Sequence, residues 1–341
     1  MQKVYAYQPI GFGDKTVAIL GAFYTHLPPD GRVNFLHDLQ SLETDQQLHD
    51  HAQLLINGLA APMRWLHSTP KTGPMAREAR LKQECLAHDG YKCVVTGLFD
   101  EESLDASSTS PTTYTGCIHI IPSSLASWKS ESEGYAKDII WTNLIRHFPA
   151  IQSLNFTREN INDTKNAMTM SNFLHRHFGR FGFSFEATSK PHRYRIQNYR
   201  SRLRLPQELL PRTVVFNSYD ERYDLPNPEL LKVHATVAHI FHASGAAHHI
   251  EKALRDLGGH SMLARDGSTD ISSMLAATTL GVLGSRVIND QQTLAAFPDS
   301  KTSPQRVQKH ATNVDRPLSE EQATYEYEGQ IPFSTMQGKT G

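Results

Sequence analysis

The order of short segments between residues 90 and 181 constrains the fold more than any other feature of this chain. The apolar run KCVVTG is followed, after a Ser- and Thr-rich loop, by a second strand-like run, TYTGCIHIIP (113–122). A polar link, RENINDTKN, then leads into AMTMSNFLHRHFGRF (167–181), where apolar residues recur at helical spacing. This order predicts two short strands, a polar loop and a helix that packs across the strands.

Three polar side chains stand at fixed places in this order: His119 in the second strand, Asn166 in the polar loop and His175 on the helix. Hydrolysis of a phosphodiester needs a base that activates water and a divalent cation that stabilises charge on the phosphate. A histidine at a strand end is a rigidly held base, and a helix across the hairpin can hold a metal ligand facing it. An asparagine at the mouth of that helix can orient the base or tie the loop.

Each of these residues also has a purely structural interpretation. His119 lies in a very apolar strand, where a lone histidine is usually a hydrogen-bonded core residue. Asn166 belongs to the residue types that cap helices, and His175 can simply pack against its neighbours. On these patterns alone, both interpretations stay open.

The chain resembles a known family over three stretches: CVVTG (93–97), CIHIIPSSL (117–125) and INDTKNAMTMSNFLHRHFGRFGFSFEA (161–187). These are similar to the HNH endonuclease domain, in the version common in fungal proteins, and the likeness continues through 225–247. The resemblance covers residues 80–258. It implies a ββα-metal core in which His119 is the general base, Asn166 the middle asparagine and His175 a metal ligand.

Two positions depart from the pattern of that family. Ile118 stands where HNH sites commonly carry an Asp or His ligand, and Gly179 stands where many carry a second ligand, one turn after His175. Mg²⁺ prefers oxygen ligands in octahedral geometry, so Asp163, the amide of Asn166 or a substrate phosphate would have to supply them. We expect one divalent ion, Mg²⁺, Mn²⁺ or a softer ion such as Ni²⁺ or Zn²⁺. It should bind weakly without nucleic acid, and turnover should be slow or absent.

Cysteine is scarce in the chain, which contains Cys85, Cys93 and Cys117 alone. This usage disfavours a secreted disulfide framework. We expect Cys93 and Cys117 to be neighbours across the hairpin, and no structural zinc, because no second cysteine follows Cys93 at knuckle spacing. Without a signal-peptide pattern or a long apolar run, the sequence predicts a soluble intracellular protein of the cytoplasm or nucleus.

A local basic patch is needed for nucleic-acid binding, because the net charge of the chain is −1. The segment HRYRIQNYRSRLR (192–204) provides a candidate with five arginines and no acidic residue. The arginines alternate along a predicted strand: Arg193, Arg195, Arg200, Arg202 and Arg204. Such a ladder can follow a phosphate backbone, or it can be a solvated strand face paired with acidic neighbours.

Residues 1–75 are expected to form an appended α/β unit before the HNH-like domain at 76–200. Within this unit, residues 15–24 predict a buried strand and 28–31 a turn, followed by one or two helices from Val33 to Leu66. The HNH-like domain should begin with an amphipathic helix over Met75–His88, ended by Asp-Gly. Strands are expected in FGFSFEA and HRYRIQNY, after the helix predicted at 167–181.

Residues 201–258 are expected to form a helical extension packed on that domain. Asn227, followed by Pro228, predicts a capped helix that runs to residue 257. The histidines of this helix are interpreted as a partly buried polar stripe. A metal site is disfavoured, because none of them has a second histidine at i+4. Residues 259–341 are read as a largely disordered tail, which completes an α+β chain with a ββα-metal core.

The function that this pattern favours is that of a metal-dependent endonuclease acting on DNA or RNA. One alternative is a binding or regulatory protein that keeps the HNH scaffold without turnover. Another is an enzyme of a different class that uses His119 as an acid or base toward a small molecule. The fold alone does not separate them, because function depends on the site.

Overall fold

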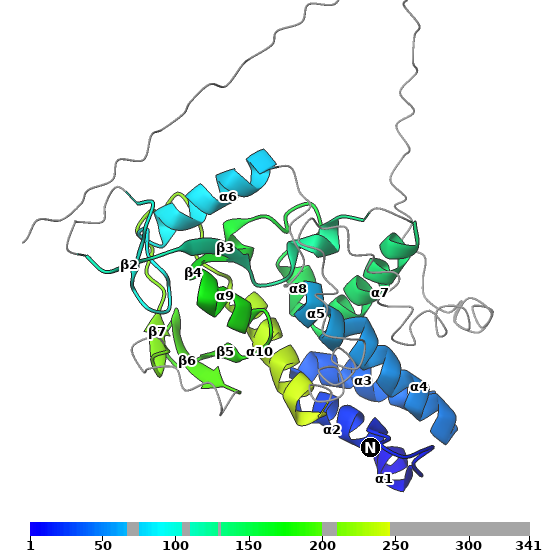
Figure 1. Cartoon of the computed structure of the whole chain (residues 1–341). Coiled ribbons are helices and arrows are strands. Elements are labelled where there is room, and N and C mark those ends of the chain that lie inside the picture. Colours follow the sequence, from blue (N-terminus) through cyan, green and yellow to red (C-terminus); the bar gives the residue numbers. More distant parts are fainter. Residues whose placement is uncertain (67–74, 104–109, 129–130, 200–209, 246–341) are drawn as a thin grey trace, which may run out of the picture. The chain divides into compact units, whose positions relative to one another are not determined.

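The computed structural model describes residues 1–66, 75–103, 110–128, 131–199 and 210–245 (Figure 1). They belong to one compact unit, in which helices and small sheets together make an α+β fold. The predicted tail lies outside the described residues, as do Arg200, Arg202 and Arg204. The helix predicted to run from Pro228 to residue 257 is wrong in its length, because it ends at Ala243 and Gly245 has a φ of 71°. The domain boundaries placed at 75, 200 and 258 stay predictions.

The regular structure of the N-terminal region is helical. Its elements are α1 (Gln2–Ala6), α2 (Thr16–His26), α3 (Pro29–Gln40), α4 (Asp45–Leu55), the π-helical η1 (Ile56–Ala60) and α5 (Ala61–Leu66). The helices predicted from Val33 onward are confirmed, whereas the strand predicted at 15–24 is wrong. Ile19, Leu20 and Phe23 share one helix face, and that face is buried in the main core.

The turn predicted at 28–31 is also wrong, because Pro29 begins α3. Proline suits the first position of a helix, where the backbone N–H has no partner within the helix in any case. Gly31 then packs against the backbone of His147, and a Cβ at this position would lie 1.9 Å from the carbonyl oxygen of His147. A close approach between distant segments therefore explains this glycine.

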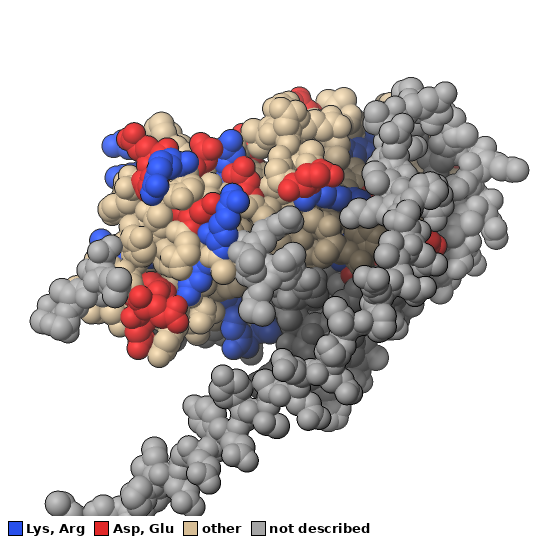
Figure 2. All heavy atoms as spheres, turned by 90° about the horizontal axis from the view of Figure 1, so that it is seen from above, with Lys and Arg blue, Asp and Glu red and all other residues tan. Residues whose placement is uncertain are grey.

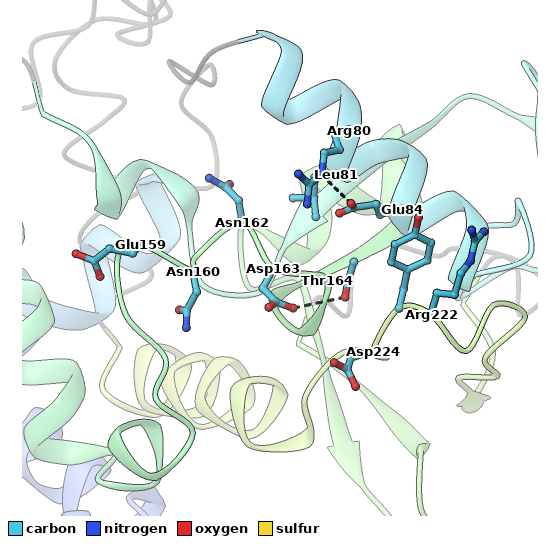
Figure 3. Close-up of a pocket in the computed structure, with 11 residues that line it drawn as sticks. Arg80, Leu81, Glu84, Glu159, Asn160, Asn162, Asp163, Thr164, Arg222 and Asp224 are labelled. Carbon is cyan, nitrogen blue, oxygen red and sulfur yellow. Dashed lines mark hydrogen bonds and ion pairs between the residues drawn. The ribbon is translucent and has the colours of Figure 1, made fainter.

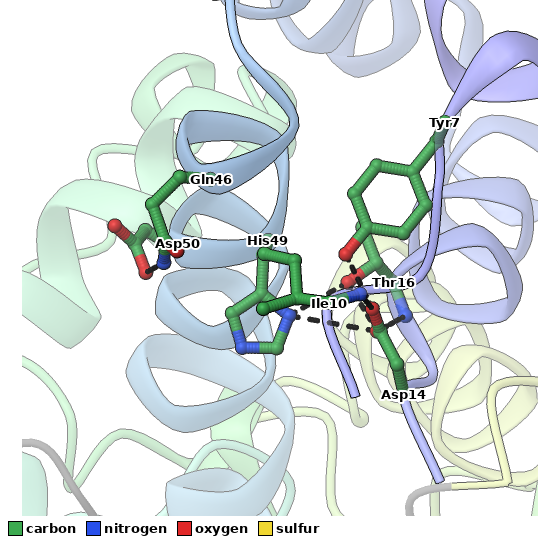
Figure 4. A network of polar contacts seen from close by, with 7 residues as sticks. All are labelled: Tyr7, Ile10, Asp14, Thr16, Gln46, His49 and Asp50. Carbon is green, nitrogen blue, oxygen red and sulfur yellow. Dashed lines mark hydrogen bonds and ion pairs between the residues drawn. The ribbon is translucent and has the colours of Figure 1, made fainter. Parts of the chain in front are cut away.

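The loop before α2 is held by the carboxylate of Asp14 (Figure 4). This carboxylate accepts hydrogen bonds from the backbone N–H of Thr16 at 2.8 Å and of Ile10 at 3.0 Å, and also from the hydroxyls of Thr16 and Tyr7. His49 Nδ1, on α4, lies 3.0 Å from Oγ1 of Thr16. Burial alone would raise the pKa of Asp14, but these hydrogen bonds outweigh burial and hold the pKa well below its usual range.

The central hairpin pairs β3 (Thr115–His119) antiparallel with β4 (Ala167–Ser171). Helix α9 (Asn172–Phe178) follows β4 directly. The helix predicted from residue 167 is therefore wrong over the residues of β4, which are all buried and bonded to β3. The helix starts only where the Ser171 side chain accepts a hydrogen bond from the backbone N–H of Leu174.

A long connection joins the two strands of this hairpin. It contains the 3₁₀ turn η2 (Ser123–Ala126), α7 (Glu131–His147), α8 (Ala150–Ser153) and the 3₁₀ turn η3 (Thr164–Asn166). The sequence of residues 141–151 indicates a helix. Helix α7 covers the first part of this range, to His147, but begins ten residues earlier, and α8 covers its end. Trp141 anchors α7, because its indole N–H donates a hydrogen bond to the carbonyl of Leu125 at 3.1 Å.

Different helices cover the two faces of the hairpin (Figure 1). Helix α6 (Met75–His88) has the predicted bounds and packs on one face of the hairpin. There its Cys85 forms a small apolar cluster with Cys117 of β3 and Ala167 of β4. Helix α9 packs on the other face. The Sγ atoms of Cys85 and Cys117 lie 3.4 Å apart, so the neighbour of Cys117 is Cys85 rather than Cys93, which packs in the main core.

The segment KCVVTG forms a turn instead of the predicted strand. Gly97 has a φ of 71°, and its N–H donates a hydrogen bond to the carbonyl of Cys93 at 2.9 Å. The N–H of Val94 donates to the carbonyl of Thr169 in β4 at 3.0 Å, while the Asp89 carboxylate accepts the Thr169 N–H at 2.6 Å. The turn thus completes the outer edge of β4. Beyond it, the short strands β1 (Phe99–Asp100) and β2 (Thr112–Thr113) pair in parallel.

The two strands predicted after α9 are confirmed as β5 (Phe183–Ala187) and β6 (Arg193–Asn198). A third strand, β7 (Thr213–Val215), pairs with β6. Helix α10 (Pro228–Ala243) packs against β5 and α2. The predicted N-cap is confirmed, because the side chain of Asn227 accepts the N–H of Glu229 at 2.9 Å.

The histidines of α10 make structural contacts, as predicted for a buried polar stripe. His234 is fully buried and stacks on Phe178, with 3.7 Å between the ring centroids. Burial lowers the pKa of His234 to about 3. His239 Nε2 lies 2.8 Å from Oε1 of Glu186, so this histidine links α10 to β5.

Candidate active site

His119 is the last residue of β3, and 4% of its surface is exposed. Side chains alternate between the two faces along a strand. His119 therefore shares its face with Cys117 and with its cross-strand partner Ala167, the residues that α6 covers. Its Nε2 lies 2.9 Å from Oδ1 of Asn162. The imidazole is thus held at the strand end, on the α6 side of the hairpin.

Asn166 is completely buried at the end of η3. Its Oδ1 accepts the backbone N–H of Ile121 at 2.8 Å, and its Nδ2 donates to the carbonyls of Ile121 and Ile161, each at 2.9 Å. Ile121 lies just after β3, whereas Ile161 lies close to the start of β4. Asn166 therefore holds the loop closed through these hydrogen bonds. It does not cap α9, because Ser171 is the N-cap of that helix.

His175 lies on α9 and is partly buried. A Cβ built on Gly116 of β3 would lie 3.7 Å from its Nδ1 and 3.3 Å from Oδ1 of Asn172. Because Gly116 faces the opposite side of β3 from Cys117, His175 lies over the face of the hairpin that His119 does not share. The structure therefore does not bring the two histidines together on one face.

The surroundings of His175 do not fit a preformed divalent-cation site. No group of three or more His, Cys, Asp or Glu side chains that could hold a metal occurs within the described ranges. The side chain of Ile118 is fully buried in the core, and Gly179 is the C-cap of α9. Since Mg²⁺ takes about six oxygen ligands and Ca²⁺ about six to eight, His175 would need ligands from elsewhere.

A cavity of about 520 Å³ adjoins Asn162 (Figure 3). It lies between α6, the loop before η3 and residues 222–224, and its lining is mostly charged or polar. The arginines in this lining are already paired: Arg80 donates to Glu84 at 2.8 Å, and Arg222 is paired with Asp220. The sequence predicted neither the cavity nor Asn162, since RENINDTKN indicated only a polar loop.

Residues 93–186 match the family model described as HNH endonuclease. This match supports an HNH-family domain. The matched range of the HNH domain includes His119, Asn166 and His175, whereas the N-terminal helices and α10 lie outside it. Neither the curated proteins nor the solved structures gave a match to the chain.

A buried contact between His88 and Asp89 lies at the end of α6. His88 Nδ1 lies 2.6 Å from Oδ1 of Asp89, and both side chains are inaccessible to solvent. Burial raises the pKa of Asp89, while its partners His88 and the N–H of Thr169 act in the opposite direction. Because the same carboxylate accepts the N–H of Thr169, this pair fixes the outer edge of the hairpin.

Arg193 and Arg195 are both exposed on β6. Arg195 is paired with Glu186 on β5, with its Nε 3.0 Å from Oε2 of that residue. Burial alone would raise the pKa of Glu186, but hydrogen bonds from Arg195 and His239 outweigh burial and lower it. Glu186 is therefore the acidic neighbour expected for Arg195 if this strand face is solvated and paired with acidic residues.

Charges of both signs mingle on the face of the molecule seen in Figure 2. Lys and Arg side chains there stand next to Asp and Glu side chains, in line with the net charge of −1. A nucleic acid that bound this face would therefore meet local positive groups rather than a uniform basic surface. Among the described helices, none is long and apolar enough to cross a membrane.

Proposed function

We propose that this protein is an HNH-type endonuclease that hydrolyses phosphodiester bonds in DNA or RNA, with His119 as the general base. The observation that carries the proposal is the placement of His119. It lies at the end of a buried strand within the HNH match, with its imidazole fixed by Asn162 beside a polar cavity. A general base needs such a fixed orientation toward the water that it deprotonates.

The neighbouring residues have supporting roles in this proposal. Asn166 keeps the long connection closed, so that Asn162 stays opposite His119. Arg193 and its neighbours along the segment contact phosphates of the nucleic acid. Metal dependence belongs to the proposal, with His175 as one ligand, but no step is assigned to the ion because its site is not formed by the described residues.

The test is cleavage of plasmid and of single-stranded RNA by the purified chain, with Mg²⁺ or Mn²⁺ and with EDTA. Cleavage should depend on the metal, and His119→Ala should reduce its rate by at least about a hundredfold. His37→Ala, at an exposed position on α3, is the matched control and should cleave like the wild type. Unchanged cleavage by His119→Ala with a wild-type melting temperature would exclude His119 as the base.

A second candidate is a scaffold that binds nucleic acid without cutting it. The observation in its favour is the absence, within the described residues, of a group of three ligands near His175. Ile118 and Gly179 support the same candidate, because neither has a side chain that could bind a metal ion. This candidate predicts salt-sensitive binding that neither EDTA nor His119→Ala changes, without any cleavage product.

A further inference from the structure

Asn162 stands between His119 and the polar cavity. Its Oδ1 lies 2.9 Å from Nε2 of His119, and the same side chain lines the cavity (Figure 3). His119 itself is 4% exposed and does not line the cavity. A contact between two side chains separated by 43 positions in the sequence therefore joins the buried histidine to the solvent-accessible space.

We infer that Asn162 is a positioning residue that sets the tautomer and the ring orientation of His119. An amide oxygen can only accept a hydrogen bond, so Nε2 of a neutral His119 must carry its proton when it faces Oδ1 of Asn162. The basic lone pair then lies on Nδ1. The partner of one ring nitrogen thus decides which nitrogen is basic, as in other histidine sites.

The rest of the loop supports this assignment. Asn166 fixes the carbonyl of Ile161, the residue that precedes Asn162, at 2.9 Å. Asp163, on the other side, caps η3 by accepting the N–H of Lys165 at 3.0 Å. The backbone is therefore held on both sides of Asn162, at Ile161 and at Asp163. The side chain of Asn162 contacts His119 at the end of β3.

This inference deepens the proposed function, because a fixed tautomer matters only if His119 acts as a base. The part that concerns structure is nevertheless testable without activity. Nitrogen NMR of protein labelled in its histidines distinguishes the two neutral tautomers, and the signal of His119 is identified from its loss in His119→Gln. The wild type should show His119 with its proton on Nε2.

The variant Asn162→Leu keeps the volume but removes the acceptor, and it should lose this preference for Nε2–H. Asn162→Asp keeps an acceptor at the same place and should retain it. Asp224→Asn, which alters another residue of the cavity lining, is the control and should leave the signal of His119 unchanged. If Asn162→Leu does not fold, Asn162→Ala provides the same comparison. An identical tautomer in the wild type and in the variants without an acceptor would overturn the inference.

Cleavage assays separate this inference from the proposed function. In an active enzyme, Asn162→Leu should lower kcat by about ten- to a hundredfold with little change in KM, because misorientation of a catalytic group affects the chemical step. Asn162→Asp should restore part of the rate. If the wild type does not cut nucleic acid, the proposed function fails, and the NMR comparison still decides the role of Asn162. If Asn162→Leu cuts as fast as the wild type, the positioning role fails, and the proposed function stands.

Discussion

The side chains of His119 and His175 lie on opposite faces of the β3–β4 hairpin. His119 shares the face that α6 covers, whereas His175 sits over Gly116 on the face that α9 covers. A base and a metal ligand that act on one phosphate need to reach the same point in space. The described structure does not provide that arrangement for His119 and His175.

Metal binding should accordingly be weak in the free protein. Calorimetric titration with Mg²⁺ should give no measurable heat of binding at micromolar protein, because no three-ligand group is formed among the described residues. Ni²⁺ or Zn²⁺ should bind more tightly than Mg²⁺, and His175→Ala should weaken that binding, whereas His37→Ala should not. Tight Mg²⁺ binding to the free wild type would contradict this expectation.

Replacement of Asn166 should destabilise the fold, whatever the activity. Asn166→Ala leaves the N–H of Ile121 and the carbonyls of Ile121 and Ile161 without their buried partner. We expect a loss of about 2–5 kcal/mol in the free energy of unfolding, measured by urea denaturation. Gln152→Ala, at an exposed position in α8, should stay within about 0.5 kcal/mol of the wild type. A wild-type midpoint for Asn166→Ala would show that these hydrogen bonds do not hold the loop.

The arginine segment should supply phosphate contacts. Replacing Arg200, Arg202 and Arg204 by alanine should weaken binding to all DNA sequences alike. It should also flatten the salt dependence of the binding constant, by about 0.9 in slope for each phosphate that an arginine no longer neutralises. Binding measured by fluorescence anisotropy from low to moderate salt tests this.

The matched control removes three exposed lysines elsewhere, namely Lys3, Lys15 and Lys232. It changes the net charge equally, so it separates a general charge effect from a local contact. Equal salt slopes in the two triple variants would place the interface elsewhere. Arg195→Ala should have a smaller effect than Arg193→Ala, because Arg195 is already paired with Glu186.

Asp14 should make the stability of the protein sensitive to acid. The pKa of Asp14 is lowered in the folded state, so its ionised form contributes stability that is fully present above the unfolded pKa of about 3.9. That contribution is lost as the pH falls through the lower, folded pKa. Asp14→Asn should therefore be less stable than the wild type at pH 6, and the difference should shrink toward pH 2.

Melting curves followed by circular dichroism at several pH values give this comparison. Asp50→Asn, on the neighbouring helix α4, is the control, because the Asp50 carboxylate accepts a hydrogen bond from Gln46 at an exposed position. A constant difference between the wild type and Asp14→Asn across this pH range would show that the hydrogen bonds to Asp14 do not favour its ionised form.

Local sequence signals predicted the elements whose cause is local. Asn227 and Pro228 marked the start of α10, and α6 ended at His88 before Asp-Gly, because caps and breakers act within a few residues. The strand that carries His119 was predicted, but its expected partner was KCVVTG, whereas β3 pairs with β4, a segment assigned to the helix. The match to the HNH family covers the same residues.

The incorrect assignments concern segments whose state depends on distant partners. Residues 167–171 have apolar positions that suit a helix or a strand, and pairing with the edge of β3 decided for a strand. The apolar run at 15–24 suited a buried strand, but its partners are helices, and one apolar face packs against them. Periodicity in a short apolar run does not distinguish these cases.

The sequence by itself determined which residue types stand at the end of β3, in the connection and on α9, and therefore the family that the domain resembles. Tertiary structure alone decided that Asn162 is the partner of His119 and that Cys117 lies next to Cys85. It also decided that His175 lies on the opposite face of the hairpin from His119. The physical reason is that each of these contacts joins side chains from separate elements. Their distance is set by how whole strands and helices pack, which no local pattern of residues encodes.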